Sequence, residues 1–229
     1  MTNILNSVKI TMLNYGGTMP KAATNLAVFI RDKTLELLLE KEPEEISTRD
    51  IAKACGVTAT SLYYYYRDRE TLFTEVKLCC IEKMDAVISE HTAKKTKQRG
   101  QSKKQDPRGE IRTGLEAFRD WAFANPRIAL LVMGRLKADT RDDPEKMKKY
   151  YQSTLFAKNL LDRTVQGGFL NSKDTLLDAS LCISALWGAI ETALLNRTVP
   201  QYWSKRGSVD FTNKMIDFLL TSLMFRKPA

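Results

Sequence analysis

The sequence has little of what most metal and disulfide sites are built from. Among its 229 residues there is one histidine, His91, and the four cysteines include no C-x-x-C pair. These residues are too few for a zinc cluster and too scattered for a disulfide framework. We therefore expect reduced, partly buried thiols at all four positions, which are Cys55, Cys79, Cys80 and Cys182.

Motifs typical of enzymes are missing as well. The chain has no G-x-S-x-G, no G-x-G-x-x-G and no P-loop, and His91 alone cannot supply a general-base network. We expect no enzymatic activity, no cofactor and no bound metal. An enzyme stays a rival hypothesis, which turnover in a panel of hydrolase and transferase substrates would support.

Long hydrophobic runs are absent. No run approaches the about 18 uninterrupted apolar residues of a membrane helix. The start, MTNILNSVKITMLNYGG, lacks the basic and then apolar segments of a secretory signal. With 43% hydrophobic and 28% charged residues, the composition is that of a soluble globular protein. We expect a cytoplasmic location and no membrane partner.

Positive charge is in excess, but it is unevenly placed. The net charge is +9, whereas residues 20–92 carry ten Lys and Arg against thirteen Asp and Glu. Residues 93–113 carry eight against two. The segment TAKKTKQRGQSKKQDPRG, 92–109, has no apolar periodicity and reads as a solvated, mobile linker. The alternative is a basic patch that attracts a DNA backbone or an anionic membrane.

Helical spacing of apolar residues dominates the sequence, and only VKITML at 8–13 looks strand-like. The predicted fold class is all-α with about nine helices. Met19 could be the true start of the protein, because a good helix begins shortly after it. The helices are expected at about 21–42, 48–55, 59–65, 69–92, 109–126, 127–139, 144–166, 174–197 and 211–225.

Two of these helices are short and are joined by Gly56 and Val57, which predicts a helix-turn-helix. Ser47 is a natural N-cap with Asp50 three positions later, and Gly56 suits a left-handed turn. Thr58 is expected to cap the second short helix, and Asp68 is expected to cap the long helix that follows.

Four consecutive tyrosines, Tyr63 to Tyr66, lie on the second short helix. With Leu62 at 0° and steps of about 100°, Tyr66 falls at about 40°, so Leu62 and Tyr66 face the core. Tyr64 falls at about 200° and Thr60 at about 160°, so both face outward. An outward aromatic hydroxyl beside small hydroxyls suits a DNA groove better than a solvent face. The alternative is that all four tyrosines are packing residues.

The segment STRDIAKACGVTATSLYYYYRDRETLF, 47–73, resembles the DNA-binding signature of the TetR/AcrR family of one-component repressors. The resemblance implies three short N-terminal helices, a connecting helix and a larger helical ligand domain. A departure is Glu42-Pro43, where the family has Gly and an aromatic residue. The matching positions are Thr48, Ile51, Ala52, Gly56, Val57, Leu62, Tyr63, Tyr65, Tyr66, Arg69 and Leu72.

The resemblance assigns roles by position. Base edges are expected to be contacted by Arg49, Thr60, Ser61 and Tyr64. Phosphates are expected to be contacted by Thr48, Thr58, Tyr63, Tyr65 and Arg69. The expected domains are a disordered arm at 1–19, the DNA-binding domain at 20–68, a connecting helix at 69–92, a basic flexible linker at 93–107 and a ligand-binding and dimerisation domain at 108–229.

The last two expected helices carry small residues at one-turn spacing and an apolar stripe, which suggest a four-helix dimer interface. The alternative is an ordinary monomer core. The expected interface residues are Leu181, Ala185, Gly188, Ala189, Phe211, Met215, Phe218 and Leu219. A ligand pocket is expected from Phe118, Trp121, Met133, Phe156, Trp187 and Glu191, although aromatic residues at this spacing also suit plain core and Glu191 also suits a helix surface.

We therefore expect a homodimeric regulator that binds double-stranded DNA and is released by a small-molecule effector. The alternative is a DNA-binding protein that acts architecturally or through a protein partner, without a small ligand. A thermal-shift screen against lipids, drugs and acyl thioesters separates the two.

Overall fold

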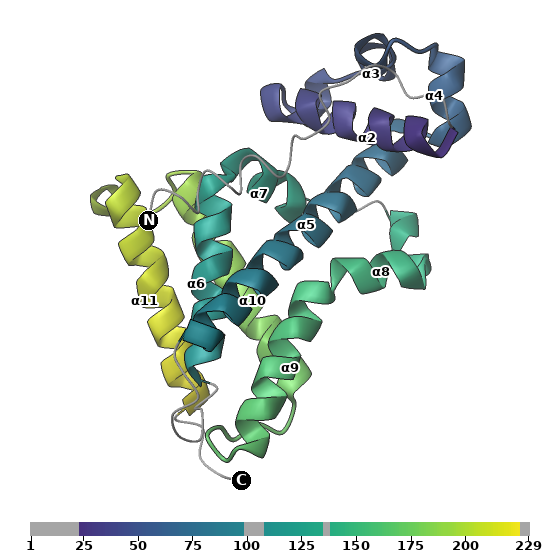
Figure 1. Cartoon of the computed structure of the whole chain (residues 1–229). Coiled ribbons are helices and arrows are strands. Elements are labelled where there is room, and N and C mark those ends of the chain that lie inside the picture. Colours follow the sequence, from purple (N-terminus) through teal and green to yellow (C-terminus); the bar gives the residue numbers. More distant parts are fainter. Residues whose placement is uncertain (1–22, 99–107, 135–137, 225–229) are drawn as a thin grey trace. The chain divides into compact units, whose positions relative to one another are not determined.

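The computed structural model describes residues 23–98, 108–134 and 138–224, and within them all regular structure is helical (Figure 1). These residues form ten α-helices and three short 3-10 helices, which confirms the predicted all-α class. The expected arm at 1–19, the strand-like stretch at 8–13 and linker residues 99–107 lie outside the described part of the chain.

The chain divides into two compact units. Among the described residues, one comprises those up to Lys83 together with those of Arg127–Tyr150, and the other comprises those of Met84–Pro126 together with those from Tyr151 onward. Helix α5, Arg69–Gln98, contributes residues to both units. The functional domain boundaries expected from the sequence stay a prediction.

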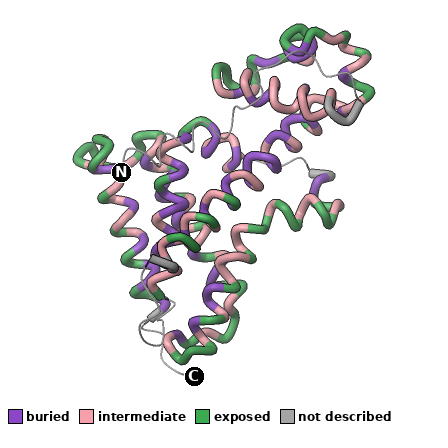
Figure 2. The backbone as a smooth tube through the Cα atoms, in the orientation of Figure 1, coloured by how far each residue is buried: buried purple, intermediate pink, exposed green. Residues whose placement is uncertain are grey.

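The first unit contains the helix-turn-helix. Its core is formed by aliphatic side chains with no exposed surface, Ile30, Ile46, Ile51, Leu62 and Leu72. Figure 2 colours the buried residues of the chain purple. Besides the first half of α5, its elements are α2 (Ala23–Glu40), η1 (Pro43–Glu45), α3 (Thr48–Cys55), α4 (Ala59–Tyr65), α7 (Pro126–Met133), η2 (Ala138–Asp142) and α8 (Pro144–Tyr150).

The second unit is a helical bundle in which α10 packs against α6, α9 and α11. Leu186, Ile190 and Ile216 are fully buried, and Leu161 is nearly so, because the apolar stripes of these helices face one another. Besides the second half of α5, its elements are α6 (Arg108–Ala124), α9 (Gln152–Gln166), α10 (Thr175–Leu194), η3 (Pro200–Tyr202) and α11 (Lys205–Met224).

Four expected helix boundaries were wrong. The helix predicted at 127–139 ends at Met133. The helix predicted at 144–166 is two helices, because Tyr151 leaves helical geometry with ψ 8°. The connecting helix continues to Gln98, so residues 93–98 of the expected linker are helical. Helix α11 begins at Lys205, where the Ser204 hydroxyl accepts a hydrogen bond from the Gly207 amide, and not at the expected position 211.

Gly207 explains why α11 can begin so early. A Cβ atom at this position would lie 2.7 Å from the Tyr202 backbone, closer than any real side chain tolerates. The glycine therefore allows the turn of η3 to approach the first turn of α11. Residues 205–210 have no apolar stripe, so a periodicity argument did not include them in the helix.

Candidate DNA-binding surface and ligand cavity

Local hydrogen bonds hold the two short helices of the helix-turn-helix. The Ser47 hydroxyl accepts from the Asp50 amide at 3.2 Å, and the Asp50 carboxylate accepts from the Ser47 amide at 2.9 Å. Gly56 ends α3 in the left-handed region at φ 67°. The Thr58 hydroxyl then accepts from the Ser61 amide at 3.1 Å and caps α4. The predicted roles of Ser47, Gly56 and Thr58 are confirmed.

The inner face of α4 is anchored by Leu62 and Tyr66. Leu62 has no exposed surface, and Tyr66 is 8% exposed. The Tyr66 hydroxyl donates a 2.8 Å hydrogen bond to the Ala27 carbonyl on α2. Burial raises the pKa of the Tyr66 phenol to about 12, so the group stays a protonated donor at neutral pH. These contacts orient the short helix, which has too few turns to be stable alone.

The opposite face of α4 is open to solvent. Tyr64 is 80% exposed and Thr60 is exposed, as the helical-wheel argument predicted. The Tyr64 ring packs edge-on against Tyr65, with ring centroids 5.0 Å apart, which limits its rotation. Ser61 is half-buried, and its hydroxyl lies 2.9 Å from that of Thr58. The surface thus presents a phenol and small hydroxyls together.

Tyr63 and Thr48 lie on one flank of this face. The Tyr63 hydroxyl donates to the Thr48 hydroxyl at 3.5 Å, which brings together two groups expected at phosphates. Arg49, next to Thr48 at the start of α3, is exposed, and Tyr65 is half-buried. Their contacts with DNA stay predictions, but their positions leave Arg49 and the Tyr63 ring accessible.

Arg69 has a structural role that the sequence did not reveal. Its guanidinium donates to the backbone carbonyl of Ile46 at 2.9 Å and to that of Pro43 at 3.3 Å. It also lies over the Phe73 ring, 5.3 Å from the centroid. Arg69 therefore fastens the loop between α2 and α3 to the first turn of α5. The departure Glu42-Pro43 lies in this same loop, so the arginine supports an unusual turn.

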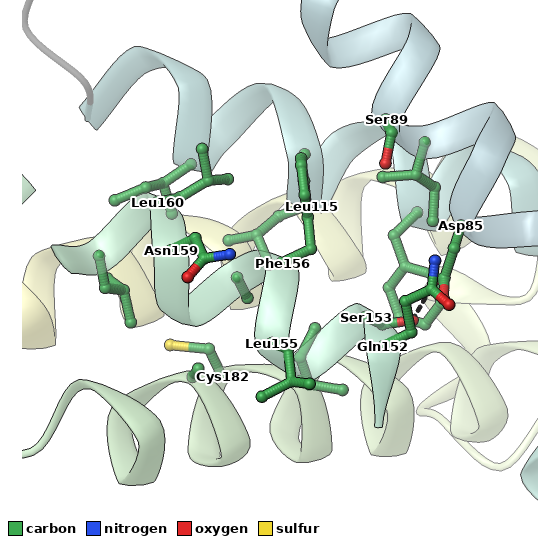
Figure 3. Close-up of a pocket in the computed structure, with 18 residues that line it drawn as sticks. Asp85, Ser89, Leu115, Gln152, Ser153, Leu155, Phe156, Asn159, Leu160 and Cys182 are labelled. Carbon is green, nitrogen blue, oxygen red and sulfur yellow. Dashed lines mark hydrogen bonds between the residues drawn. The ribbon is translucent and has the colours of Figure 1, made fainter. Parts of the chain in front are cut away.

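The second unit contains a cavity of about 290 Å³ whose walls come from α5, α6, α9 and α10 (Figure 3). Most of its lining is apolar, including Leu115, Leu155, Phe156 and Leu160. This mixture of aliphatic and aromatic side chains around a few polar groups is typical of small-molecule sites.

The polar end of the cavity is formed by Asp85, Ser89, Gln152 and Ser153, which Figure 3 shows close together. Asp85 is 5% exposed, and its carboxylate accepts a hydrogen bond from the Ser153 hydroxyl. The sequence analysis missed Asp85. The available signal was an acidic residue on the apolar stripe of α5, four positions after Ile81 and three before Ile88.

Comparisons with known proteins agree with this geometry. Residues 30–76 match the family model for bacterial regulatory proteins of the tetR family. The TetR-family regulator PfmR from Thermus thermophilus is 16% identical, with a TM-score of 0.55 over 86% of this chain and 99% of that chain. The chain has the DNA-binding domain and the fold of the TetR family. The resemblance inferred from residues 47–73 is therefore confirmed.

Two regulators named FadR share this fold. FadR from Bacillus halodurans is 15% identical, with a TM-score of 0.63 over 90% of this chain and all of that chain. FadR from Bacillus subtilis, solved in complex with stearoyl-CoA, is 17% identical, with a TM-score of 0.59 over 86% of this chain and 98% of that chain. No curated protein matches the sequence significantly.

Of the expected pocket residues, Phe118 and Phe156 line the cavity. Trp187 packs edge-on against Phe118, with centroids 4.5 Å apart, and Trp121 is buried in the core. Met133 ends α7 in the first unit, and Glu191 is exposed on α10, so neither lies among the lining residues.

The residues expected at the dimer interface differ in exposure. Leu181 is 51% exposed, Phe218 is 65% exposed and Gly188 is exposed. Ala185, Phe211 and Met215 are half-buried, whereas Ala189 and Leu219 are buried within the chain. The exposed face of α10 is a regular stripe of Leu177, Leu181, Ser184, Gly188, Glu191 and Leu195, spaced alternately four and three positions apart.

Helix α10 is also the one helix in the described part of the chain that is long and apolar enough to cross a membrane by length and composition. Seven of its residues, including Leu186 and Ile190, are buried against neighbouring helices. A core helix of a soluble protein passes the same test, so its composition is explained by packing.

Proposed function

We propose that this TetR-family protein is a cytoplasmic, homodimeric transcriptional repressor that releases a palindromic operator when a small molecule occupies the cavity in the second unit. The observation that carries the DNA-binding role is the orientation of α4. Leu62 and Tyr66 anchor this helix in the core. The side chains of Tyr64 and Thr60 face outward and are exposed. Such a helix can enter a major groove and contact base edges.

Dimerisation would make DNA binding by α4 specific for a palindromic sequence. The exposed stripe on α10, together with the exposed Phe218 on α11, would bury apolar area against a second copy. Two symmetry-related recognition helices about 34 Å apart would then read successive major grooves, so the operator would be palindromic.

Helix α5 would couple ligand binding in the cavity to DNA binding. Near its start Arg69 fastens the loop that precedes α3, and further along the same helix Asp85, Ile88 and Ser89 line the cavity. The sixteen positions from Arg69 to Asp85 correspond to about 24 Å of helix. A ligand that favours one position of α5 would shift the population of DNA-binding conformations. A coupling of about 1–3 kcal/mol would give about 5–150-fold control.

The fold relatives support a small ligand in the second unit, since the Bacillus subtilis FadR structure holds stearoyl-CoA. The cavity in this chain has walls from four helices, so its shape depends on their relative positions. This arrangement supports a binding role.

The test is selection of bound DNA from a random pool, followed by release with a metabolite library. We expect a palindromic motif and at least one compound that releases it. The matched variants are Tyr64→Ala, which should lose the motif, and Leu155→Ala, which alters the cavity and should keep it. A pool without sequence enrichment contradicts the proposal.

A further inference from the structure

We propose that α4 recognises its half of the palindromic operator mainly through thymine, whose C5-methyl group contacts the Thr60 methyl group and the Tyr64 ring. The inference rests on the proposed function, since it names the base chemistry that the same DNA-binding surface selects. It is carried by the side chains that α4 presents and by the kinds of side chain that α4 lacks.

The recognition helix has none of the side chains that identify a base by paired or charged hydrogen bonds. Helix α4, ATSLYYY, contains no arginine, lysine, asparagine, glutamine, aspartate or glutamate. In the major groove arginine and lysine select guanine, asparagine and glutamine select adenine, and carboxylates accept from cytosine. Hydroxyl groups both donate and accept, so they discriminate little between bases. Apolar contact is the remaining means of selection, and thymine is the base that presents a methyl group there.

Several hydroxyl groups of this surface are already bonded within the protein. The Thr58 hydroxyl accepts from the Ser61 amide at 3.1 Å and lies 2.9 Å from the Ser61 hydroxyl. The Tyr63 hydroxyl donates to a threonine hydroxyl on α3 at 3.5 Å. Within the described part of the chain, the side chains of Thr60 and Tyr64 make no hydrogen bond. These two side chains are therefore the ones of α4 that are best placed to contact a base.

Thr60 and Tyr64 lie next to each other on the exposed face of α4. They are four positions apart, so their Cβ atoms are about 5–6 Å from each other. Tyr64 is 80% exposed, and its ring is held at 86° to the ring of Tyr65. Successive base pairs are about 3.4 Å apart along the duplex. The two side chains can therefore contact methyl groups of thymines that lie within about two base pairs of each other.

Positive charge on the helix-turn-helix lies outside α4. Arg49 and Lys53 are exposed on α3. Arg67 follows the end of α4 and forms an ion pair with Asp68 at 3.5 Å. A guanine in the operator would therefore be contacted from α3, by the Arg49 guanidinium, and not from α4. Thymine recognition and guanine recognition are thus assigned to different helices, which makes them separable by mutation.

The test replaces thymine with deoxyuridine, which lacks only the methyl group. The operator selected from a random pool is synthesised again with deoxyuridine at one thymine of each half at a time. Binding of the full-length protein is measured by fluorescence anisotropy at one salt concentration. From the usual contribution of one buried methyl group, we expect about fourfold weaker binding for each methyl group removed and about 15-fold for a symmetric pair. Equal affinity for the thymine and deoxyuridine operators at every position overturns the proposal.

Paired variants assign the methyl contacts to residues. Thr60→Ser removes the side-chain methyl group and keeps the hydroxyl, so it should lose the difference between thymine and deoxyuridine at one position. Thr60→Val keeps a methyl group there and should retain that difference. At the second position Tyr64→Ala should lose the difference, and Tyr64→Phe, which keeps the ring, should retain it. Arg49→Ala is the control on α3 and should retain both differences. Any other pattern in the serine and valine variants rejects Thr60 as the methyl contact.

The selection step separates this inference from the proposed function. A pool without an enriched sequence rejects the regulator role and the thymine preference together. An enriched operator that binds equally well with deoxyuridine, or that has no conserved thymine, leaves the regulator role in place and rejects thymine recognition alone.

Discussion

The Tyr66 hydroxyl donates to the Ala27 carbonyl at 2.8 Å, which joins the end of the recognition helix to a residue 39 positions earlier on α2. Because α4 has only seven residues, this long-range contact and the burial of Leu62 decide its orientation. The outward position of Tyr64 follows from the same anchoring.

Replacing Tyr66 with phenylalanine should lower the free energy of unfolding by about 1–2 kcal/mol, because a partly buried carbonyl loses its donor. Urea denaturation measures the change. Tyr64→Phe is the control on the same helix, since the Tyr64 ring is 80% exposed and its loss of a hydroxyl should leave stability unchanged. Equal effects of the two substitutions would contradict the anchoring role.

Replacing Arg49 with alanine should relax the base preference at one operator position and cost about 1–3 kcal/mol of specific binding. A binding-site logo obtained from a randomised operator measures this. Lys53→Ala, which removes an exposed basic residue from the same helix, should keep the logo. Uniform weakening by Arg49→Ala, with an unchanged logo, would instead place Arg49 at the DNA backbone.

Arg69 should have two separable effects, because it donates to backbone carbonyls and also carries charge near the expected DNA surface. Arg69→Ala and Arg69→Lys should both lower stability by about 1–2 kcal/mol. Only the alanine variant should reduce the salt dependence of DNA binding, by about one in the logarithmic slope. Titrations over several salt concentrations that show the same slope for all three proteins would leave Arg69 with a positioning role alone.

Alkaline pH should destabilise the first unit. Burial raises the pKa of Cys55 to about 11 and that of Cys80 to about 12, whereas unfolded thiols titrate near about 8.5. Above about pH 8.5 the unfolded state therefore loses protons that the folded state retains, and stability falls as pH rises toward 11. The urea midpoint should decrease from pH 7.5 to pH 10. A Cys55→Ala, Cys80→Ala double variant should show a smaller decrease, and parallel decreases would refute the assignment.

A second carboxylate in the exposed stripe of α10, which already contains Glu191 near one end, should prevent dimerisation when it replaces a leucine of the stripe. Leu181→Glu should give a monomer in sedimentation experiments, because the carboxylate would be buried without a partner. Leu176→Glu is the control, since Leu176 is 46% exposed but lies about 100° away from the stripe. A dimer that survives Leu181→Glu would indicate another interface.

The DNA-binding half of the site was largely predictable from the sequence. Ser47, Gly56 and Thr58 act through contacts within a few positions, so residue type and spacing were enough to place the caps and the turn. The outward position of Tyr64 also followed from helical geometry. The structural role of Arg69 did not follow from the sequence. The two backbone carbonyls that accept its hydrogen bonds lie 23 and 26 positions earlier.

The cavity in the second unit was not predictable in this way. Phe118 and Phe156 were predicted because aromatic side chains are conspicuous, but the acidic residue that was predicted is Glu191, and Asp85 was missed. Asp85 contacts Ser153, 68 positions later, and the register of α5 against α9 cannot be read from either helix alone.

By itself the sequence determined the helical class, the helix-turn-helix and the outward face of its recognition helix, since these depend on hydrogen bonds and side-chain spacing within a few residues. Only the tertiary structure decided that the segment 144–166 breaks at Tyr151. Neither glycine nor proline marks this position. Ion pairs of 2.9 Å join Lys146 to Glu75 and Lys149 to Glu82 on one side of the break, and the Ser153 contact with Asp85 lies on the other. Contacts between distant segments, which no local pattern contains, determine where the helix ends and which carboxylate enters the cavity.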